Sequence, residues 1–168
     1  MTPGRATRRA WWPDVVGVAW VVLAAGALLA PALAHGASLG PFDLLSRYGL
    51  TTQPGVRVHY TGPGDQIDAL IPWTTLAWNQ VHHGHLPLWN PYSGLGLPLA
   101  FNWQSSVFSL PALIGYLFPV RLAYTVAMVV TLVVAGTGVY VLARMLGLGV
   151  LGCTMAATVY ELSGPVTG

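Results

Sequence analysis

A run of twenty residues near the N-terminus constrains the fold of this chain more than any other feature. Residues 15–34, VVGVAWVVLAAGALLAPALA, carry no charged side chain. As an α-helix that rises about 1.5 Å per residue, such a run crosses a hydrocarbon core of roughly 30 Å. We therefore expect residues 15–34 to be the first transmembrane helix, with residues 1–14 as a cytoplasmic N-terminus.

Charged residues are scarce in the rest of the chain as well. The 168 residues are 54% hydrophobic and 7% charged, whereas soluble domains carry about 25% charged residues. All seven basic residues are arginines, and they form no run that could follow a phosphate backbone. This composition indicates a membrane protein in contact with the lipid bilayer and excludes nucleic acid as a partner.

The arginines near the N-terminus predict the orientation of the first helix. Arg5, Arg8 and Arg9 precede it, and arginines in a short flank favour the cytoplasmic side. A cleavable secretory signal is the alternative, because a basic start and an apolar run ending in Ala-Leu-Ala at Ala34 also fit that pattern. The apolar run is, however, longer than the usual 7–15 residues or so of a signal peptide.

Two further membrane segments are expected in the C-terminal half. Residues 121–146 contain an uncharged stretch between Arg121 and Arg144, which predicts a second transmembrane helix that runs from outside to inside. Residues 149–168 begin a third, and we expect the chain to be a fragment of a longer protein. The predicted fold class is an all-α membrane protein, the N-terminal part of a multi-helix bundle.

The intervening residues, 35–120, are expected to form a long extracytoplasmic loop. Apolar residues recur at helical spacing from Ile67 to Val81 and predict an amphipathic helix over about residues 65–83, with a kink at Pro72. Trp73 and Trp78 on this helix would suit the membrane interface. A second, short helix bounded by prolines is expected over about residues 107–118.

Asp65 and Asp68 are the most informative polar residues of this loop. Their spacing suits a helix start, in which Asp65 accepts hydrogen bonds from backbone N–H groups and Asp68 faces the positive end of the helix dipole. A carboxylate outside a membrane helix bundle can also act as general base and take a proton from an acceptor hydroxyl that attacks a glycosyl centre. The spacing alone leaves both interpretations open.

Histidines and arginines offer weaker candidates. The histidines of the motif HHGH, residues 82–85, have no companion cysteine or histidine at metal-ligand spacing, so no metal site is predicted there. Arg57 and Arg121 could bind a phosphate through paired donors or could anchor the chain at the membrane border.

Two residues of the expected third helix also need an explanation. Cys153 lies in an apolar stretch and is expected to be a small packing residue. Glu161 would be unfavourable in lipid, so a partner or a water-lined cavity is expected beside it. Because the third helix approaches the outer surface at this point, structural and functional interpretations of Glu161 remain open.

Several motifs of the chain together resemble a known family. The first loop contains GDQ, then a Trp shortly after the apolar pair Leu-Ile, and then GHLPLWNPYSGLGLP; the third helix contains LSG. Over residues 64–164 or so, the sequence resembles the start of the bacterial YfhO-like membrane proteins. These proteins belong to the wider group of GT-C type glycosyltransferases.

The resemblance implies a multi-helix enzyme of the bacterial cell membrane. Such an enzyme moves a sugar from a polyprenyl-phosphate donor to a cell-envelope acceptor outside the cytoplasm. By position, Asp65 matches the acidic residue expected to be the general base, and Gln66 would help to position the substrate. Asp68 could bind a divalent cation, orient the acceptor or only cap the helix.

The remaining candidate substrate contacts are loop residues together with the two arginines and Glu161. The loop residues are Trp73, Trp89, Asn90, Tyr92 and Trp103. Glu161 departs from the pattern expected just before LSG. The alternative function is a non-catalytic membrane scaffold, or a lipid-handling or transport protein, of the same architecture.

Overall fold

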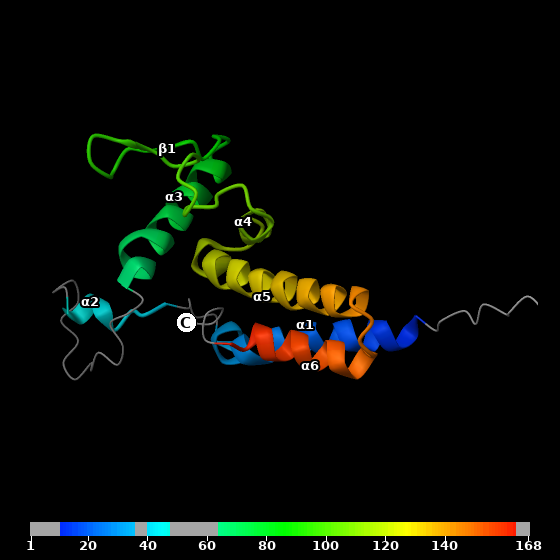
Figure 1. Cartoon of the computed structure of the whole chain (residues 1–168). Helices are drawn as coiled ribbons and strands as arrows, with labels where there is room; N and C mark the ends of the chain where they lie inside the picture. Colours follow the sequence, from blue (N-terminus) through cyan, green and yellow to red (C-terminus); the bar gives the residue numbers. More distant parts are fainter. Residues whose placement is uncertain (1–10, 36–39, 48–63, 164–168) are drawn as a thin grey trace, which may run out of the picture. The chain divides into compact units, whose positions relative to one another are not determined.

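The computed structural model describes residues 11–35, 40–47 and 64–163. The chain is mostly helical, and two of its helices, α1 (Trp12–Ala34) and α5 (Val120–Met145), are long and apolar enough to cross a membrane (Figure 1). The residues group into two compact units. Of the described residues, one unit comprises those up to Leu28 and from Leu132 to Ser163, and the other comprises those between Leu29 and Thr131. Helix α5 therefore contributes its C-terminal half to the first unit and its N-terminal half to the second.

The first unit is built from three helices that lie side by side: α1, the second half of α5, and α6 (Val150–Glu161) (Figure 1). Its buried core consists mainly of small side chains, with one tyrosine and one valine. Small residues let helix backbones approach closely, which is how helices associate in a lipid environment. The buried core residues are Val21, Tyr140, Ala143, Cys153 and Ala157.

Gly17 is the point of closest approach between these helices. A Cβ atom on Gly17 would lie 2.7 Å from Cε2 of Tyr140 and 2.8 Å from Oγ1 of Thr154. The first neighbour belongs to α5 and the second to α6, so the absent side chain allows α1 to contact both helices at once.

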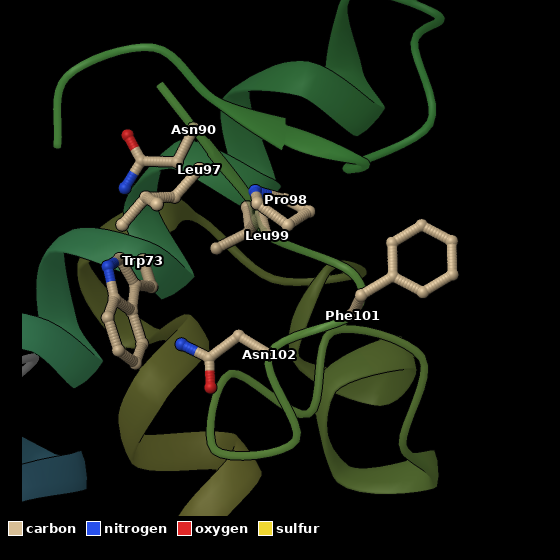
Figure 2. A pocket seen from close by; sticks show the side chains of 7 residues that line it. All are labelled: Trp73, Asn90, Leu97, Pro98, Leu99, Phe101 and Asn102. Atoms are coloured by element: carbon tan, nitrogen blue, oxygen red, sulfur yellow. The ribbon is translucent and has the colours of Figure 1, made fainter. Parts of the chain in front are cut away.

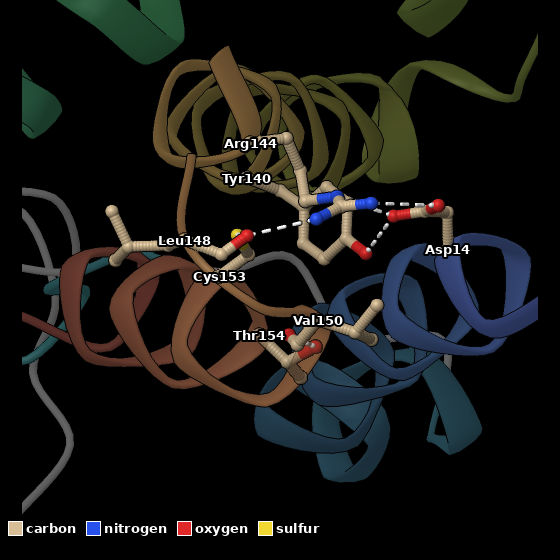
Figure 3. A network of polar contacts seen from close by, with 7 residues as sticks. All are labelled: Asp14, Tyr140, Arg144, Leu148, Val150, Cys153 and Thr154. Carbon is tan, nitrogen blue, oxygen red and sulfur yellow. Dashed lines mark hydrogen bonds and ion pairs between the residues drawn. The ribbon is translucent and has the colours of Figure 1, made fainter. Parts of the chain in front are cut away.

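A polar network fastens one end of this unit (Figure 3). Asp14 lies in the first turn of α1, and Arg144 lies in the last turn of α5. Nε of Arg144 is 2.6 Å from Oδ1 of Asp14, and Nη2 donates to Oδ2 at 3.2 Å. The hydroxyl of Tyr140 donates to Oδ1 at 2.8 Å, and Nη1 of Arg144 donates to the carbonyl oxygen of Leu148. Helix α1 therefore begins where α5 ends, and the two helices are antiparallel.

The position of Asp14 differs from the sequence-based expectation. The expected boundary placed Asp14 in the cytoplasmic tail, but α1 begins at Trp12 and includes Asp14. An acidic residue near a helix N-terminus and a basic residue near a helix C-terminus each complement the local helix dipole. This pairing explains how α1 can carry a charged residue in its first turn.

The second unit contains the segment that was expected to form an amphipathic helix. The helix starts at Gly64, passes through a π-helical turn, η1 (Gln66–Leu70), and continues as α3 (Ile71–His82). The backbone N–H of Ile71 donates to the carbonyl oxygen of Gln66, five residues earlier. Because Pro72 has no N–H and its ring crowds the carbonyl four residues back, the widened turn relieves the strain that was expected as a kink.

A short hairpin and a short helix follow α3 along the chain. Strand β1 (Trp89–Asn90) pairs antiparallel with β2 (Leu97–Pro98), with Trp89 opposite Pro98. These strands were not expected from the sequence. Helix α4 (Leu110–Gly115) is capped by Ser109, whose hydroxyl accepts from the N–H of Ala112. Helix α2 (Leu44–Arg47) completes the described elements of this unit.

The second unit has its own core, and α3 contributes its tryptophans to it. Trp73 and Trp78 are partly buried and pack against the buried residues of this core. Nε1 of Trp78 donates to the carbonyl oxygen of Phe118 at 2.8 Å, which ties α3 to the residues after α4. The buried residues of this core are Ala77, Leu99, Val107 and Tyr116.

Replacing Gly17 with alanine tests the close approach in the first unit. The added methyl group must displace Tyr140, whose hydroxyl is held by Asp14, so we expect the free energy of unfolding to fall by about 1–3 kcal/mol. Gly26 on the same helix has no atom within 4 Å of the point where a Cβ would lie. Gly26→Ala should therefore leave stability unchanged or raise it by about 0.5–1 kcal/mol. Thermal unfolding in detergent measures both, and equal effects would contradict the packing.

Candidate functional site

A pocket of about 240 Å³ opens in the second unit (Figure 2). One wall is Trp73 of α3, and the rest comes from the hairpin and the chain that follows it. Ligand pockets are typically lined by apolar and aromatic groups with a few polar groups that fix orientation, and this pocket has two asparagines among apolar residues. The lining residues are Trp73, Asn90, Leu97, Pro98, Leu99, Phe101 and Asn102.

Asn90 positions the hairpin turn. Its Oδ1 accepts from the backbone N–H of Tyr92 at 2.9 Å, and its Nδ2 donates to the hydroxyl of Ser93 at 3.0 Å. An asparagine that bonds the backbone two residues ahead mimics a turn of the main chain. The buried Asn90 therefore uses its amide to form the turn and contributes to the pocket wall at the same time.

Gly96 and Trp89 fit together across the hairpin. Gly96 has a φ of 100°, and a Cβ atom there would lie 2.7 Å from both Cζ2 and Nε1 of Trp89. The indole therefore occupies the space over the glycine. The carbonyl oxygen of Trp89 accepts from Nε2 of Gln80, which attaches the hairpin to α3. The motif WNPYSGLGLP thus has a structural explanation as a hairpin that carries part of the pocket.

Asn102 supplies the second amide of the pocket. Its Oδ1 accepts from the backbone N–H of Gln104 at 3.1 Å. Figure 2 shows its amide nitrogen directed towards the side of the pocket where Trp73 lies, whereas Phe101 points away from the other lining residues. Trp73 thus provides the flat aromatic surface, and Asn102 provides a hydrogen-bond donor.

The acidic residues lie before the pocket along the same helical segment. Asp65 is exposed, and its backbone is helical, with φ −57° and ψ −27°. Its side chain makes no capping hydrogen bond, so the helix starts here without the cap that was expected from Asp65. Asp68 is exposed and Gln66 is half-buried in the π-helical turn. By the rise of a helix, Asp65 lies on the order of 12 Å along the chain from Trp73.

The other predicted site residues are dispersed. Tyr92 and Trp103 are 84% and 88% exposed and do not line the pocket. Arg121 is exposed at the start of α5, and Glu161 is buried in the three-helix unit. Arg57 lies outside the described residues.

Of the predicted residues, the structure brings Trp73 and Asn90 together in one pocket. Sequence reasoning missed the other lining residues, which lie in the segment LPLAFN, comprising β2 and the residues that follow it. The only available signal was the position of Asn102 shortly after the GLGLP motif. The residues missed were Leu97, Pro98, Leu99, Phe101 and Asn102.

No metal centre is formed by the described residues. In these parts of the chain, no group of three or more His, Cys, Asp or Glu side chains could hold an ion. Nδ1 of His82 lies 2.9 Å from the carbonyl oxygen of Trp78, and Nδ1 of His83 lies 2.7 Å from that of Asn79. These two histidines therefore face carbonyl groups near the C-terminal end of α3, and the carbonyl of Asn79 also accepts from the backbone N–H of His83.

Tyr116 supports the core beneath the pocket. Its hydroxyl donates to the carbonyl oxygen of Val107 at 2.9 Å, and burial raises the pKa of Tyr116 from 10.0 to about 12. A group with a raised pKa contributes stability that is complete below its unfolded pKa and is lost as the pH rises through the folded one. The contribution of Tyr116 is therefore complete at neutral pH and is lost between about pH 10 and 12.

Two neighbouring glycines allow a matched test of the hairpin. Gly94, with φ 60°, has no atom within 4 Å of a Cβ position, whereas Gly96 is crowded by Trp89. Gly94→Ala should cost about 1–2 kcal/mol of unfolding free energy for backbone strain alone. Gly96→Ala should cost about 1–3 kcal/mol more, because the methyl group also displaces the indole. In a Trp89→Ala background the cost of Gly96→Ala should fall by the part that is due to the indole; an unchanged cost would show that the crowding is not the cause.

Searches against protein-family models, curated proteins and solved structures found no match to this chain.

Proposed function

We propose that this chain is part of a membrane glycosyltransferase with a multi-helix bundle of the GT-C type. It would move a sugar from a polyprenyl-phosphate donor to a cell-envelope acceptor on the extracytoplasmic side of a bacterial membrane. The observation that carries the proposal is the pocket, which is lined by aromatic and amide side chains. Its residues lie in the sequence between α1 and α5, the two helices that are long and apolar enough to cross a membrane.

The charge distribution around the pocket supports a neutral ligand such as a sugar ring. Residues 69–120 contain no Asp, Glu, Lys or Arg, so no charged side chain of this stretch attracts an ion into the pocket. The indole of Trp73 offers a flat face for the C–H groups of a sugar, and the amide of Asn102 can bond a hydroxyl. Charged groups flank the stretch, with Asp68 before it and Arg121 after it.

Asp65 is the general base in the proposed reaction. Its exposed carboxylate makes no capping hydrogen bond, so it can take the proton of an acceptor hydroxyl as that oxygen bonds to the anomeric carbon. The bond from that carbon to the phosphate oxygen breaks, and polyprenyl phosphate leaves with the electron pair. Gln66 would orient the acceptor beside Asp65.

The donor phosphate and a possible cation complete the proposal. The guanidinium groups of Arg121 and Arg57 would stabilise the negative charge that develops on the phosphate as it leaves. Asp68 would orient the acceptor or bind a divalent cation. In this proposal α1 and α5 cross the lipid bilayer, which is the protein's other partner.

A non-catalytic scaffold, or a lipid-handling or transport protein, is the second candidate. One observation favours it: three residues of the hairpin motif, Trp89, Asn90 and Gly96, have packing or hydrogen-bonding roles that explain them without a substrate. In that case Asp65→Asn should be silent, since the side chain is exposed and makes no capping bond.

The decisive measurement is transfer of radiolabelled sugar from polyprenyl-phosphate donors in membranes that contain the full-length protein. We expect Asp65→Asn at matched expression to lower the rate about 10²–10⁴-fold, as loss of a general base does. Trp73→Ala should mainly raise the KM for the donor, while Phe108→Ala, an exposed aromatic outside the pocket, should change neither. Equal transfer by wild type and Asp65→Asn would contradict the assigned base and favour the scaffold.

A further inference from the structure

Glu161 is the most unusual polar residue of the three-helix unit. It is the only glutamate of the chain and the last residue of α6. Its side chain is fully buried, and neither carboxyl oxygen has a hydrogen-bond partner in the part of the chain that the structure describes. Buried carboxyl groups are normally paired, so this arrangement calls for an explanation.

The packing of Glu161 places it deep in the unit. Its nearest helix neighbours include Gly136 of α5, where an added Cβ would lie 3.1 Å from Oε2 of Glu161 and 2.7 Å from Cγ1 of Val21. Gly136 therefore makes the space that both Glu161 and the α1 residue Val21 occupy. The three residues form one layer across the three helices.

The depth of this layer follows from the polar network at the end of the unit. Val21 lies nine residues after the start of α1, and Gly136 lies nine residues before the end of α5. Glu161 lies eleven residues after the start of α6. At about 1.5 Å per residue, all three are roughly 14–17 Å from that end, which is about half of a 30 Å hydrocarbon core. If α1 and α5 cross a bilayer as proposed, this depth corresponds to the middle of the membrane.

The ionisable side chains of the polar network already have hydrogen-bond partners other than Glu161. On α1 and α5, Asp14, Tyr140 and Arg144 bond to one another, and the layer with Val21 is seven residues, or roughly 10 Å, beyond Asp14 along α1. On α6 itself the ionisable side chains are Cys153, Tyr160 and Glu161. None of the described groups forms an ion pair or hydrogen bond with the Glu161 carboxyl.

The same layer does not suit a metal ion. Calcium and magnesium need about six oxygen ligands, and no cluster of three acidic, histidine or cysteine side chains exists among the described residues. Gly136 lies close to the carboxyl on one side, and Val21 lies close to the same glycine. A proton is the ligand that this geometry accommodates.

We propose that Glu161 is a proton-binding site inside the membrane. In the helix arrangement seen here, the carboxyl group holds a proton on one oxygen as a neutral acid, because an ionised group would have neither a counter-ion nor a donor. Release of the proton to water breaks the O–H bond and leaves a carboxylate, which requires α1, α5 and α6 to separate enough to admit water. Protonation of Glu161 is thus coupled to the packing of this layer, independently of the pocket in the second unit.

Infrared spectroscopy of the full-length protein can detect the proton. The protein is purified in a maltoside detergent, which has no carbonyl group, and the spectrum of Glu161→Gln is subtracted from that of the wild type at pH 7. We expect a carbonyl band of a protonated carboxylic acid in the difference spectrum, with the band shifted in D₂O. Carboxylate bands in its place would overturn the proposal.

A linkage measurement gives a second, independent readout. If folded Glu161 holds a proton that the unfolded chain releases, unfolding becomes easier as the pH rises. Above the pKa of the unfolded carboxyl, the unfolding equilibrium constant of the wild type should rise with pH relative to that of Glu161→Gln, whose neutral amide has nearly the same shape, by at most about tenfold per pH unit. Parallel curves for the two proteins would show that Glu161 is ionised in the fold, and the proposal would fail.

Discussion

The close contact between Gly17 and the ring of Tyr140 sets the geometry of the three-helix unit. Because α1 can approach α5 this closely, the hydroxyl of Tyr140 reaches Asp14 and the guanidinium of Arg144 reaches the same carboxylate. That shared acceptor fixes the register of two antiparallel helices. One layer further in, the same register brings Gly136 against Val21, which is where Glu161 finds its place. Both the polar network around Asp14 and the position of Glu161 therefore depend on the absence of a side chain at Gly17.

The second unit is organised by bonds between short elements instead of by long helices. Gln80 holds β1, the N–H of Ala100 donates to the carbonyl oxygen of Leu88, and Trp78 holds the residues after α4. Each bond joins segments that could not fold in isolation, since a two-residue strand pair has little stability of its own. These connections also form the pocket, because its walls come from α3, from the hairpin and from the residues that follow β2.

The long helices could be predicted from the sequence because uncharged runs of this length have few alternatives. The helix at the start of the proposed site was also anticipated, since apolar residues recur at helical spacing from Ile67 onward. Its details were not. A capping side chain needs an extended backbone at its own residue, whereas the backbone of Asp65 is helical, and spacing does not reveal this.

Tertiary contacts account for what the sequence could not show. The pocket joins Trp73 to Asn102 across a hairpin whose pairing depends on Trp89 covering Gly96, and no local pattern marks such a pair. The role of Asp14 depended on Arg144, and the burial of Glu161 depended on the packing of three helices. Arg57, Asp65, Gln66 and Asp68 remain predictions as site residues, because their assigned roles involve a substrate.

The bond between Asp14 and Arg144 also bears on how the protein is made. The two residues are 130 positions apart, and a ribosome that adds about 5–20 residues per second needs roughly 6–26 s to produce the second after the first. During that interval the guanidinium that neutralises the Asp14 carboxylate in the folded unit does not yet exist. Helix α1 is therefore synthesised completely before its charged partner on α5, so the ion pair forms only after both helices have left the ribosome.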